Sequence, residues 1–349
     1  MKIYLKAYAE KNLGDDIFIK IILERYRNHE FFLVSGKNYL KFNNLNIKRH
    51  RIINKIMKIL SNNRVSYEKI YIKKFDITIL LGGSMFIQND KYIKKSILEN
   101  AKKYYIIGSN FGPYNTNEYH KYYENIFKGA RDICFREKHS CNLFKELSNV
   151  RCASDIVFSM DISNIKITNN KKVVISVIEC GRKTSIVDKE KYENKMVEMC
   201  RYFIQKDYQV TLMSYCKSEK DEEAIESILT KCDNKIREKI NTYYYRGNIE
   251  EALNVMGDCQ IVVGARFHAN IIGLLLGKTI IPIAYSNKTI NVLNDMKFKG
   301  KILKVKEIDT FDVNSLTEQD LNYKHDISLQ IKDAQRQFEK LDELLNKKG

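Results

Sequence analysis

Short apolar runs alternate with amphipathic segments along the whole chain, and this alternation predicts the secondary structure. In the first half, runs typical of strands are 3–8, 31–34, 77–81, 104–108 and 133–135. A second series is 173–178, 210–213, 242–245, 261–263, 280–284 and 302–305. Segments with helical periodicity separate them, for example 221–228 and 249–256. Continuous apolar strands that alternate with helices are typical of parallel sheets covered on both faces.

A polar stretch after Met160, DISNIKITNNKK, separates the two series of strands. The chain has 349 residues, more than one hydrophobic core usually supports. We therefore predict an α/β protein of two Rossmann-like lobes, residues 1–165 and 166–349, with a cleft between them. Parallel sheets bind ligands at the carboxyl ends of their strands, so we expect binding groups in the turns that follow the strands.

The C-terminal part of the chain has apolar residues at helical spacing. They are Ile327, Ile331, Ala334, Phe338, Leu341 and Leu345. This stripe predicts a helix over 327–346 that packs on the body of the protein, and a return to the N-terminal lobe is one arrangement.

Charge is the feature of the composition that adds most to this picture. Lys and Arg number 60 against 43 Asp and Glu, which gives a formal net charge of +17. Such an excess favours an anionic partner: nucleic acid, a membrane surface or a phosphorylated substrate. No RNP-type aromatic motif, zinc finger or helix-turn-helix pattern accompanies the charge, so we expect no nucleic acid partner.

Basic residues are concentrated in the segment 36–75, where Glu68 is the single acid. Within it, apolar and basic positions of residues 51–60 alternate as in a basic amphipathic helix. Such a helix either lies on the anionic inner leaflet of a membrane or packs on the core with a solvated lysine face. The sequence leaves both interpretations open.

Other features of the sequence bear on the compartment and on metals. No apolar run is long enough to cross a bilayer, and MKIYLKAYAEKNLGDD lacks the apolar region of a signal peptide. We therefore expect a cytoplasmic protein, with association to the cytoplasmic face of the inner membrane left open. The 8 cysteines include no C-x-x-C pair, so we expect neither a disulfide framework nor a bound metal.

The most informative motif follows the apolar run 261–263. In QIVVGARFHANIIGLLLGKTIIPIAY, Arg266 and His268 lie between a strand and the start of a helix. Backbone N–H groups at that start favour an anion, and Arg266 adds a fork for a carboxylate or phosphate. His268 can transfer a proton near neutral pH. The alternative is a histidine that only caps the helix.

Turns after other strands carry glycine or polar residues. Gly82 and Gly83 permit close approach of a ligand to the backbone, and Asn110 follows the next strand. Neither turn is a G-x-G-x-x-G or Walker A loop, which disfavours dinucleotide and P-loop functions.

Charged residues in two further turns have two interpretations each. Asp15 and Asp16 of NLGDD either hydrogen-bond sugar hydroxyls or cap the following helix. Arg136 follows the run 133–135 and either faces the cleft or pairs with a local acid such as Glu137.

Taken in order, these segments resemble the polysaccharide pyruvyl transferase family. The resemblance rests on NLGDD, LLGGSMF, GSNFGP, CFREKHS, ASDIVF and GARFHANIIGLLLGKTIIPIAYSNK, and it covers residues 3–295. It implies a two-lobed fold similar to GT-B glycosyltransferases. It also implies transfer of the pyruvyl group of phosphoenolpyruvate onto two sugar hydroxyls, which forms a ketal and releases phosphate. The implied co-substrate is phosphoenolpyruvate, without a further cofactor or metal.

The resemblance also implies roles for individual residues. Arg136 and Arg266 match arginines that hold phosphoenolpyruvate, and we expect His268 to be the general acid/base. The expected donor-binding residues are Arg136, Arg266, Phe267, His268, Tyr285 and Lys288. The expected acceptor-binding residues are Asn12, Gly14, Asp15, Asp16, Gly82, Gly83 and Asn110. The expected catalytic residues are His268, Arg266 and Asp15. The sequence departs from the family at Phe267, where leucine is commoner, and at Ser84, where glycine is usual.

The implied acceptor is a sugar of a bacterial surface polysaccharide, free or linked to a polyprenyl diphosphate lipid. Two other functions stay open from the sequence. A nucleotide-sugar glycosyltransferase would use Arg266 and His268 on a diphosphate, with Glu179 the nearest candidate for a ribose. A basic nucleic-acid- or membrane-binding protein without catalysis would bind polyanions independently of Arg266.

Overall fold

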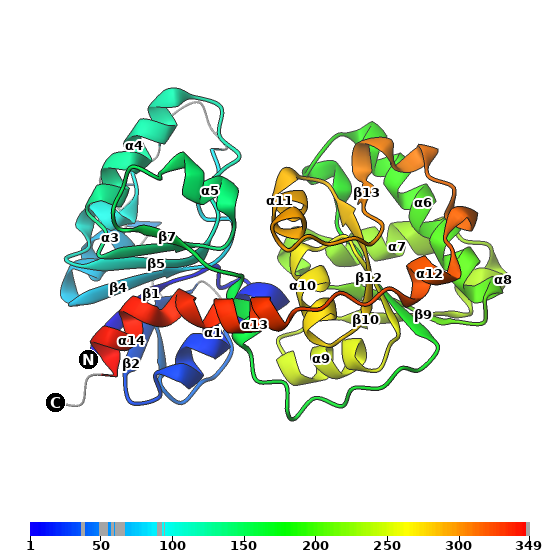
Figure 1. Ribbon diagram of the computed structural model, residues 1–349, viewed down its shortest axis with the longest axis horizontal. Coiled ribbons are helices and arrows are strands. Elements are labelled where there is room, and N and C mark those ends of the chain that lie inside the picture. The colour runs from blue at the N-terminus through cyan, green and yellow to red at the C-terminus, as the bar shows by residue number, and fades with distance from the viewer. Residues whose placement is uncertain are drawn as a thin grey trace. The chain divides into compact units, whose positions relative to one another are not determined.

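The computed structural model describes residues 1–35, 39–48, 55–56, 59, 67–88, 93 and 95–346, which form two compact units (Figure 1). The first unit contains Met1–Glu10, Ile17–Ser159 and Gln330–Gly349. The second contains Lys11–Asp16 and Met160–Leu329. Two segments therefore do not follow a single boundary at residue 165. Residues 11–16 belong to the second unit, and residues from Gln330 onward belong to the first unit.

The first unit is built on a parallel sheet with the strand order β3–β2–β1–β4–β5–β6–β7. Its strands are β1 (Lys2–Lys6), β2 (Glu30–Val34), β3 (Leu45–Lys48), β4 (Ile77–Leu81), β5 (Tyr104–Ser109), β6 (Asp132–Phe135) and β7 (Val150–Cys152). The apolar runs predicted all the strands of the sheet interior. They missed β3 and β7, because these short edge strands are only partly buried and lack a continuous apolar run.

Helices cover both faces of this sheet (Figure 1). On one face lie α3 (Tyr67–Tyr71) and α4 (Asn117–Lys128), and α5 (Lys138–Leu143) follows β6. The buried side of α4 joins an aromatic cluster that contains Phe86, Phe111, Tyr123, Phe127 and Phe144. The other face carries α1 (Leu13–Arg25) and the C-terminal residues.

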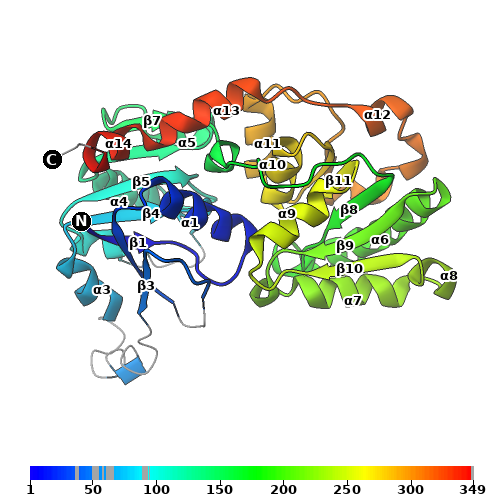
Figure 2. The same cartoon turned by 90° about the horizontal axis from the view of Figure 1, so that it is seen from below.

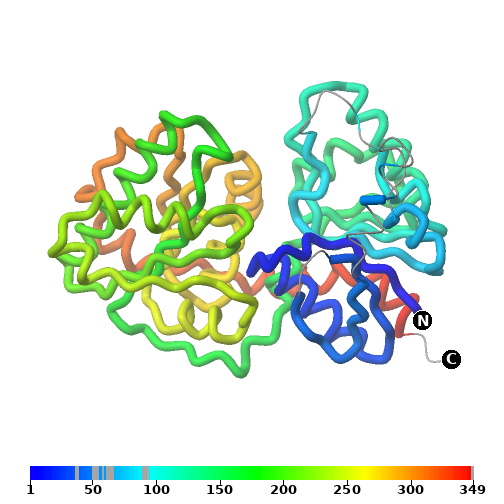
Figure 3. Tube along the Cα trace, turned by 180° about the vertical axis from the view of Figure 1, so that it is seen from behind, coloured from blue at the N-terminus to red at the C-terminus, as the bar shows by residue number. Residues whose placement is uncertain are grey.

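The C-terminal segment consists of α13 (Ser328–Ala334), a 3₁₀ turn (Gln335–Phe338) and α14 (Glu339–Leu345). The predicted helix over 327–346 is thus interrupted, because the turn brings Gln337 and Phe338 into the interior, where both are fully buried. The Arg25 guanidinium binds the Asp342 carboxylate and lies 4.3 Å from the centre of the Phe338 ring. Figure 3 shows this segment in red beside the blue N-terminal part of the first unit.

The second unit is built on a parallel sheet with the order β10–β9–β8–β11–β12–β13. Its strands are β8 (Lys172–Ser176), β9 (Gln209–Ser214), β10 (Ile240–Tyr244), β11 (Ile261–Gly264), β12 (Thr279–Ala284) and β13 (Leu303–Lys304). Each corresponds to an apolar run predicted from the sequence. Two parallel-sheet α/β units confirm the predicted fold class.

Helices also cover the second sheet (Figure 2). The apolar sides of α6 (Ile186–Gln205) and α7 (Asp221–Lys231) form one core with alternate residues of β8, β9, β11 and β12. On the opposite face, α10 (Phe267–Leu275) lies so close to the sheet that a Cβ at Gly273 would be 2.8 Å from Ile280 Cγ2. The remaining helices are α8 (Asn234–Arg237), α9 (Ile249–Gly257), α11 (Asn287–Asp295) and α12 (Glu318–Asn322).

The predicted basic amphipathic helix falls mostly outside the described residues. Of its positions, Lys55, Ile56 and Ile59 are described, and they are helical and exposed. Within the described ranges, no helix combines the length and the apolar character needed to cross a membrane.

The C-terminal segment should stabilise the first unit. Replacing Phe338 with alanine removes a fully buried ring, so we expect the free energy of unfolding of this unit to fall by about 3–5 kcal/mol. Amide hydrogen exchange in β5–β7 measures this loss. The matched control is Leu329→Ala, since Leu329 is 76% exposed and should change stability by about 0.5 kcal/mol or less. Equal amide hydrogen exchange in Phe338→Ala and Leu329→Ala would contradict the assignment of the C-terminal segment to the core of the first unit.

Candidate functional site

Because both sheets are parallel, residues that follow the strands collect at one edge of each sheet. This arrangement produces two groups of polar side chains, one in each unit. The first group surrounds Arg136 and the second surrounds Arg266.

In the first unit, Arg136 directly follows β6 and is only 4% exposed. Its Nη1 donates to Asp155 Oδ2 at 2.9 Å, and its Nη2 donates to Asn110 Oδ1 at 2.9 Å. The backbone N–H of Arg136 donates to the carbonyl of Ser109, the last residue of β5. Three neighbouring strand ends therefore fix one guanidinium group.

Gly82 and Gly83 follow β4 at the same edge. A Cβ at Gly83 would lie 2.4 Å from Nη2 of Arg136, so the absence of a side chain makes room for the guanidinium. Gly82 has a φ of +130°, a conformation that glycine adopts readily. The structure thus brings Gly82, Gly83 and Asn110 together with Arg136.

Arg136 pairs with Asp155 and not with Glu137, the local acid considered from the sequence. The Glu137 side chain instead caps α5, where Oε1 accepts from the backbone N–H of Ser140 at 3.0 Å. Asp155 was not among the predicted site residues. Asp155 lies in the ASDIVF segment, 19 residues after Arg136. Nothing in the sequence around either residue indicates that the two are in contact.

In the second unit, Arg266 follows β11 at the start of α10 and is 7% exposed. Its Nε donates to Asp221 Oδ2 at 3.0 Å, and its Nη2 also donates to the Asp221 carboxylate. Its Nη1 donates to Glu219 Oε2 at 2.7 Å. The guanidinium is therefore oriented by two carboxylates, neither of which was predicted as a site residue.

The two carboxylates differ in their surroundings. Asp221 is fully buried and also accepts the backbone N–H groups of Tyr215 and Cys216, each at 2.9 Å. Glu219 is nearer to solvent, with a side chain 17% exposed, and also binds Lys183 Nζ at 2.7 Å. Burial would raise the pKa of Glu219, but the positive charges of Arg266 and Lys183 outweigh it and lower the pKa to about 2.

The NLGDD motif lies in the second unit beside Arg266 and His268. The backbone N–H of Leu13 donates to the Tyr215 carbonyl at 3.1 Å, and the Asn12 amide donates to Glu219 at 3.4 Å. A Cβ at Gly14 would lie 1.8 Å from Nδ1 of His268, so this glycine makes room for the imidazole. The sequence had grouped NLGDD with Gly82, Gly83 and Asn110, whereas the structure groups it with the Arg-x-His turn.

The two aspartates of NLGDD differ in exposure. Asp16 is fully buried and accepts the hydroxyl of Tyr245 at 2.6 Å. Burial and the neighbouring carboxylate raise the pKa of Tyr245, so its hydroxyl keeps the proton that it donates. Asp15 is partly exposed in the first turn of α1. Of the two, Asp15 is therefore the carboxylate that a soluble ligand can reach, and Asp16 holds the segment in place.

Tyr285 directly follows β12, and Lys288 lies in the first turn of α11, near the same arginine. Lys288 Nζ is 5.4 Å from the centre of the Tyr285 ring and 6.0 Å from that of Phe267, whose ring also contacts His268 edge-on. Burial would raise the pKa of Tyr285, but the charges of Lys288, Arg266 and Lys183 lower it overall. Three cations thus act on one phenol, an environment suited to anions.

The described residues contain no group of three or more His, Cys, Asp or Glu side chains placed to hold a metal ion. The side chains around Arg266 offer cationic groups for an anion, and an imidazole and a phenol for proton transfer.

Glu219 should make the stability of the second unit depend on pH. A carboxyl whose pKa falls from 4.5 to about 2 on folding stabilises the fold above pH 4.5 and loses this contribution as the pH falls towards 2. We expect the free energy of unfolding of the wild type to exceed that of Glu219→Gln by about 3 kcal/mol at pH 7. Denaturation of both proteins between pH 7 and pH 2 measures the difference, and a difference that does not shrink on acidification would contradict the assignment.

The chain is similar to known proteins in sequence and in fold. Residues 12–287 match the sequence profile of the polysaccharide pyruvyl transferase family. The amylovoran biosynthesis protein AmsJ of Erwinia amylovora is 22% identical over an alignment 253 residues long, which covers 64% of this chain. The match spans 60% of the length of AmsJ.

Solved structures similar to the chain include GT-B glycosyltransferases and epimerases. A UDP-GlcNAc 2-epimerase from Methanocaldococcus jannaschii has a TM-score of 0.58 at 10% identity, and the match covers 98% of this chain and 100% of that one. The trehalose-6-phosphate synthase OtsA has a TM-score of 0.58 at 7% identity, with 100% and 99% covered. At such identities the similarity concerns the fold. The profile match extends from NLGDD to the residues after β12, and the chain therefore belongs to the polysaccharide pyruvyl transferase family.

Proposed function

We propose that the protein transfers the pyruvyl group of phosphoenolpyruvate onto a sugar of a bacterial surface polysaccharide or of its lipid-linked precursor. Membership of the family supports the pyruvyl transfer, and the similarity to an amylovoran biosynthesis protein supports a polysaccharide acceptor. The observation that carries the proposal is the group of Arg266, Lys183 and Lys288 around Tyr285, with His268 in the same turn as Arg266.

Phosphoenolpyruvate carries a carboxylate and a phosphate, and this group of cations suits both. A guanidinium has five N–H donors, of which Arg266 uses three on Asp221 and Glu219. The other two N–H groups of Arg266 would bind the donor substrate. Because Asp221 is the more deeply buried carboxylate, it would keep Arg266 oriented while Glu219 yields to the substrate anion.

The reaction requires proton transfer at two stages. Protonation of the methylene carbon uses the electrons of the C=C bond and leaves a cationic centre at C2, which a sugar hydroxyl attacks with loss of its proton. A second hydroxyl then attacks C2 and also loses a proton, while the bond from C2 to the phosphate oxygen breaks. We assign the proton transfers to His268, with Arg266 and Arg136 binding the negative charge of the donor.

For the glycosyltransferase interpretation, the candidate for the ribose is Glu179. Glu179 Oε2 accepts the backbone N–H of Arg182 at 2.7 Å, and Oε1 binds Lys189 at 2.9 Å. Its carboxylate thus caps a 3₁₀ turn.

Binding of phosphoenolpyruvate can be measured without knowledge of the acceptor. At about 100 times its dissociation constant, it should raise the free energy of unfolding by about 2.7 kcal/mol, seen as a rise in Tm. We expect Arg266→Lys to lose most of this rise, because lysine cannot form the fork. Arg246→Ala is the control, since Arg246 is a half-exposed arginine of the same unit that pairs with Glu222. Stabilisation by UDP or CMP alone would favour a glycosyltransferase, and salt-sensitive stabilisation by RNA alone a polyanion-binding protein.

Loss of the imidazole should affect turnover more than donor binding. In His268→Gln we expect kcat to fall by about 10²–10⁴-fold, the usual contribution of a general acid/base, with a small change in the Kd for phosphoenolpyruvate. Phosphate release from phosphoenolpyruvate in the presence of glycan acceptors measures the rate. The exposed His139→Gln serves as control. A near-normal kcat in His268→Gln would overturn the assignment of this residue.

A further inference from the structure

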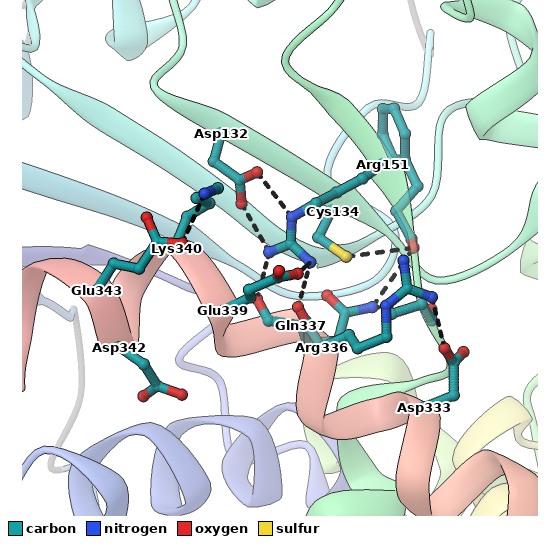
Figure 4. Close-up of polar contacts among 12 residues, drawn as sticks. Asp132, Cys134, Arg151, Asp333, Arg336, Gln337, Glu339, Lys340, Asp342 and Glu343 are labelled. Atoms are coloured by element: carbon teal, nitrogen blue, oxygen red, sulfur yellow. Dashed lines mark hydrogen bonds and ion pairs between the residues drawn. The ribbon is translucent and has the colours of Figure 1, made fainter.

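Gln337 is a fully buried polar residue near the C-terminal end of the chain. It lies in the 3₁₀ turn between α13 and α14, on the sheet of the first unit. Figure 4 shows its side chain directed from the turn towards the strands. A buried amide needs hydrogen-bond partners, and those of Gln337 lie far away in the sequence.

The carboxamide of Gln337 binds the ends of three neighbouring strands. Its Nε2 lies within hydrogen-bonding distance of the carbonyls of Ala153, at 2.9 Å, Ser154, at 3.1 Å, and Phe135, at 3.4 Å. Its Oε1 accepts the backbone N–H of Gly108 at 2.9 Å. One side chain therefore links the ends of β5 and β6 with the residues after β7.

The N–H of Gly108 requires such a partner for a local reason. The pairing of β5 with β6 shifts register between Ile107 and Ser109, and Gly108 between them has a φ of +67°. This irregularity takes the glycine out of the regular ladder. Gln337 supplies the acceptor that the neighbouring strand does not.

The residues that the Gln337 carboxamide binds all lie within two residues of a member of the Arg136 group. Phe135 directly precedes Arg136, and Ser154 directly precedes Asp155, which binds Nη1 of Arg136. Gly108 is two residues before Asn110, which binds Nη2. The carboxamide and the guanidinium thus depend on the same three strand ends.

Other contacts hold the turn itself in place. The Arg151 guanidinium pairs with Asp132 through two hydrogen bonds of 2.8 Å, and it also donates to the backbone carbonyls of Arg336 and Gln337 (Figure 4). Asp333 accepts the backbone N–H of Ser154 at 2.7 Å. The backbone of Gln337 is thereby fixed, and its side chain has a defined position against the strands.

We propose that Gln337 is a positioning residue, which sets the orientation of Arg136 by fixing the three strand ends that carry Arg136, Asp155 and Asn110. Its consequence for phosphoenolpyruvate rests on the function proposed above. The effect of Gln337 on the orientation of the Arg136 guanidinium does not depend on that function, and it can be measured separately.

The test uses the full chain with Gln337→Met, which keeps the size of the side chain and removes its polar atoms. ¹⁵N NMR follows hydrogen exchange of the guanidinium N–H groups of Arg136, whose signal is assigned by its loss in Arg136→Lys. We expect exchange about tenfold faster or more in Gln337→Met, and a Kd for phosphoenolpyruvate weakened about tenfold, as is typical when a residue that orients a binding group is removed. If Gln337→Met does not fold, Gln337→Glu, which still accepts the Gly108 N–H but offers at most one O–H in place of two N–H donors, should show the same changes in smaller size.

Asp342→Asn is the matched control. It weakens the attachment of the same C-terminal segment through Arg25 and Tyr26 without touching the strand ends. We expect Asp342→Asn to lower Tm. We expect it to leave unchanged both the hydrogen exchange of the Arg136 guanidinium N–H groups and the Kd for phosphoenolpyruvate. If Gln337→Met lowers Tm in the same way without faster exchange of Arg136, Gln337 only anchors the segment and the proposal is wrong. If the wild type binds no phosphoenolpyruvate, the proposed function fails, while the exchange measurement still decides the role of Gln337.

Discussion

A guanidinium buried at the end of a parallel strand must be neutralised and hydrogen-bonded within the protein, and this requirement organises both units. Arg136 and Arg266 are each more than nine-tenths buried, and each binds an aspartate that follows another strand of the same sheet. The ion pairs consequently fix several strand ends at once. Each unit presents an arginine whose orientation is set by the fold and not by a mobile side chain, which is the property that recognition of a rigid anion needs.

Glycines of the family motifs have a shared physical purpose in this arrangement. Gly83 lies against the guanidinium of Arg136, and Gly14 lies against the imidazole of His268. In both places a methyl group would overlap the functional side chain. The glycines therefore shape the space that the charged groups occupy, and their motifs are separated in sequence from the residues that they accommodate.

Much of the fold followed from the sequence, because buried parallel strands are continuous apolar runs that need no knowledge of tertiary contacts. The edge strands β3 and β7 lack this signal. The site was predicted where chemistry and position coincide in one turn, as for Arg266 and His268. Its carboxylates were missed, because Asp221 begins the acidic sequence DEEA and has the appearance of an ordinary first helical turn. The placement of NLGDD beside Arg266 depends on backbone pairing of this motif with Tyr215 and Cys216. The local sequence contains no pattern that predicts this pairing.

The division of the chain between the units has a consequence for its synthesis. The second unit takes its last residues from the segment that ends at Leu329, whereas the first unit needs Gln337, Phe338 and Leu341 to complete its interior. A ribosome delivers these residues after the whole of the second unit, so the second unit can close while the sheet of the first unit still lacks one side of its covering. Until these residues emerge, the apolar surface that receives Phe338 and the unpaired N–H of Gly108 stay open to water and to chaperones.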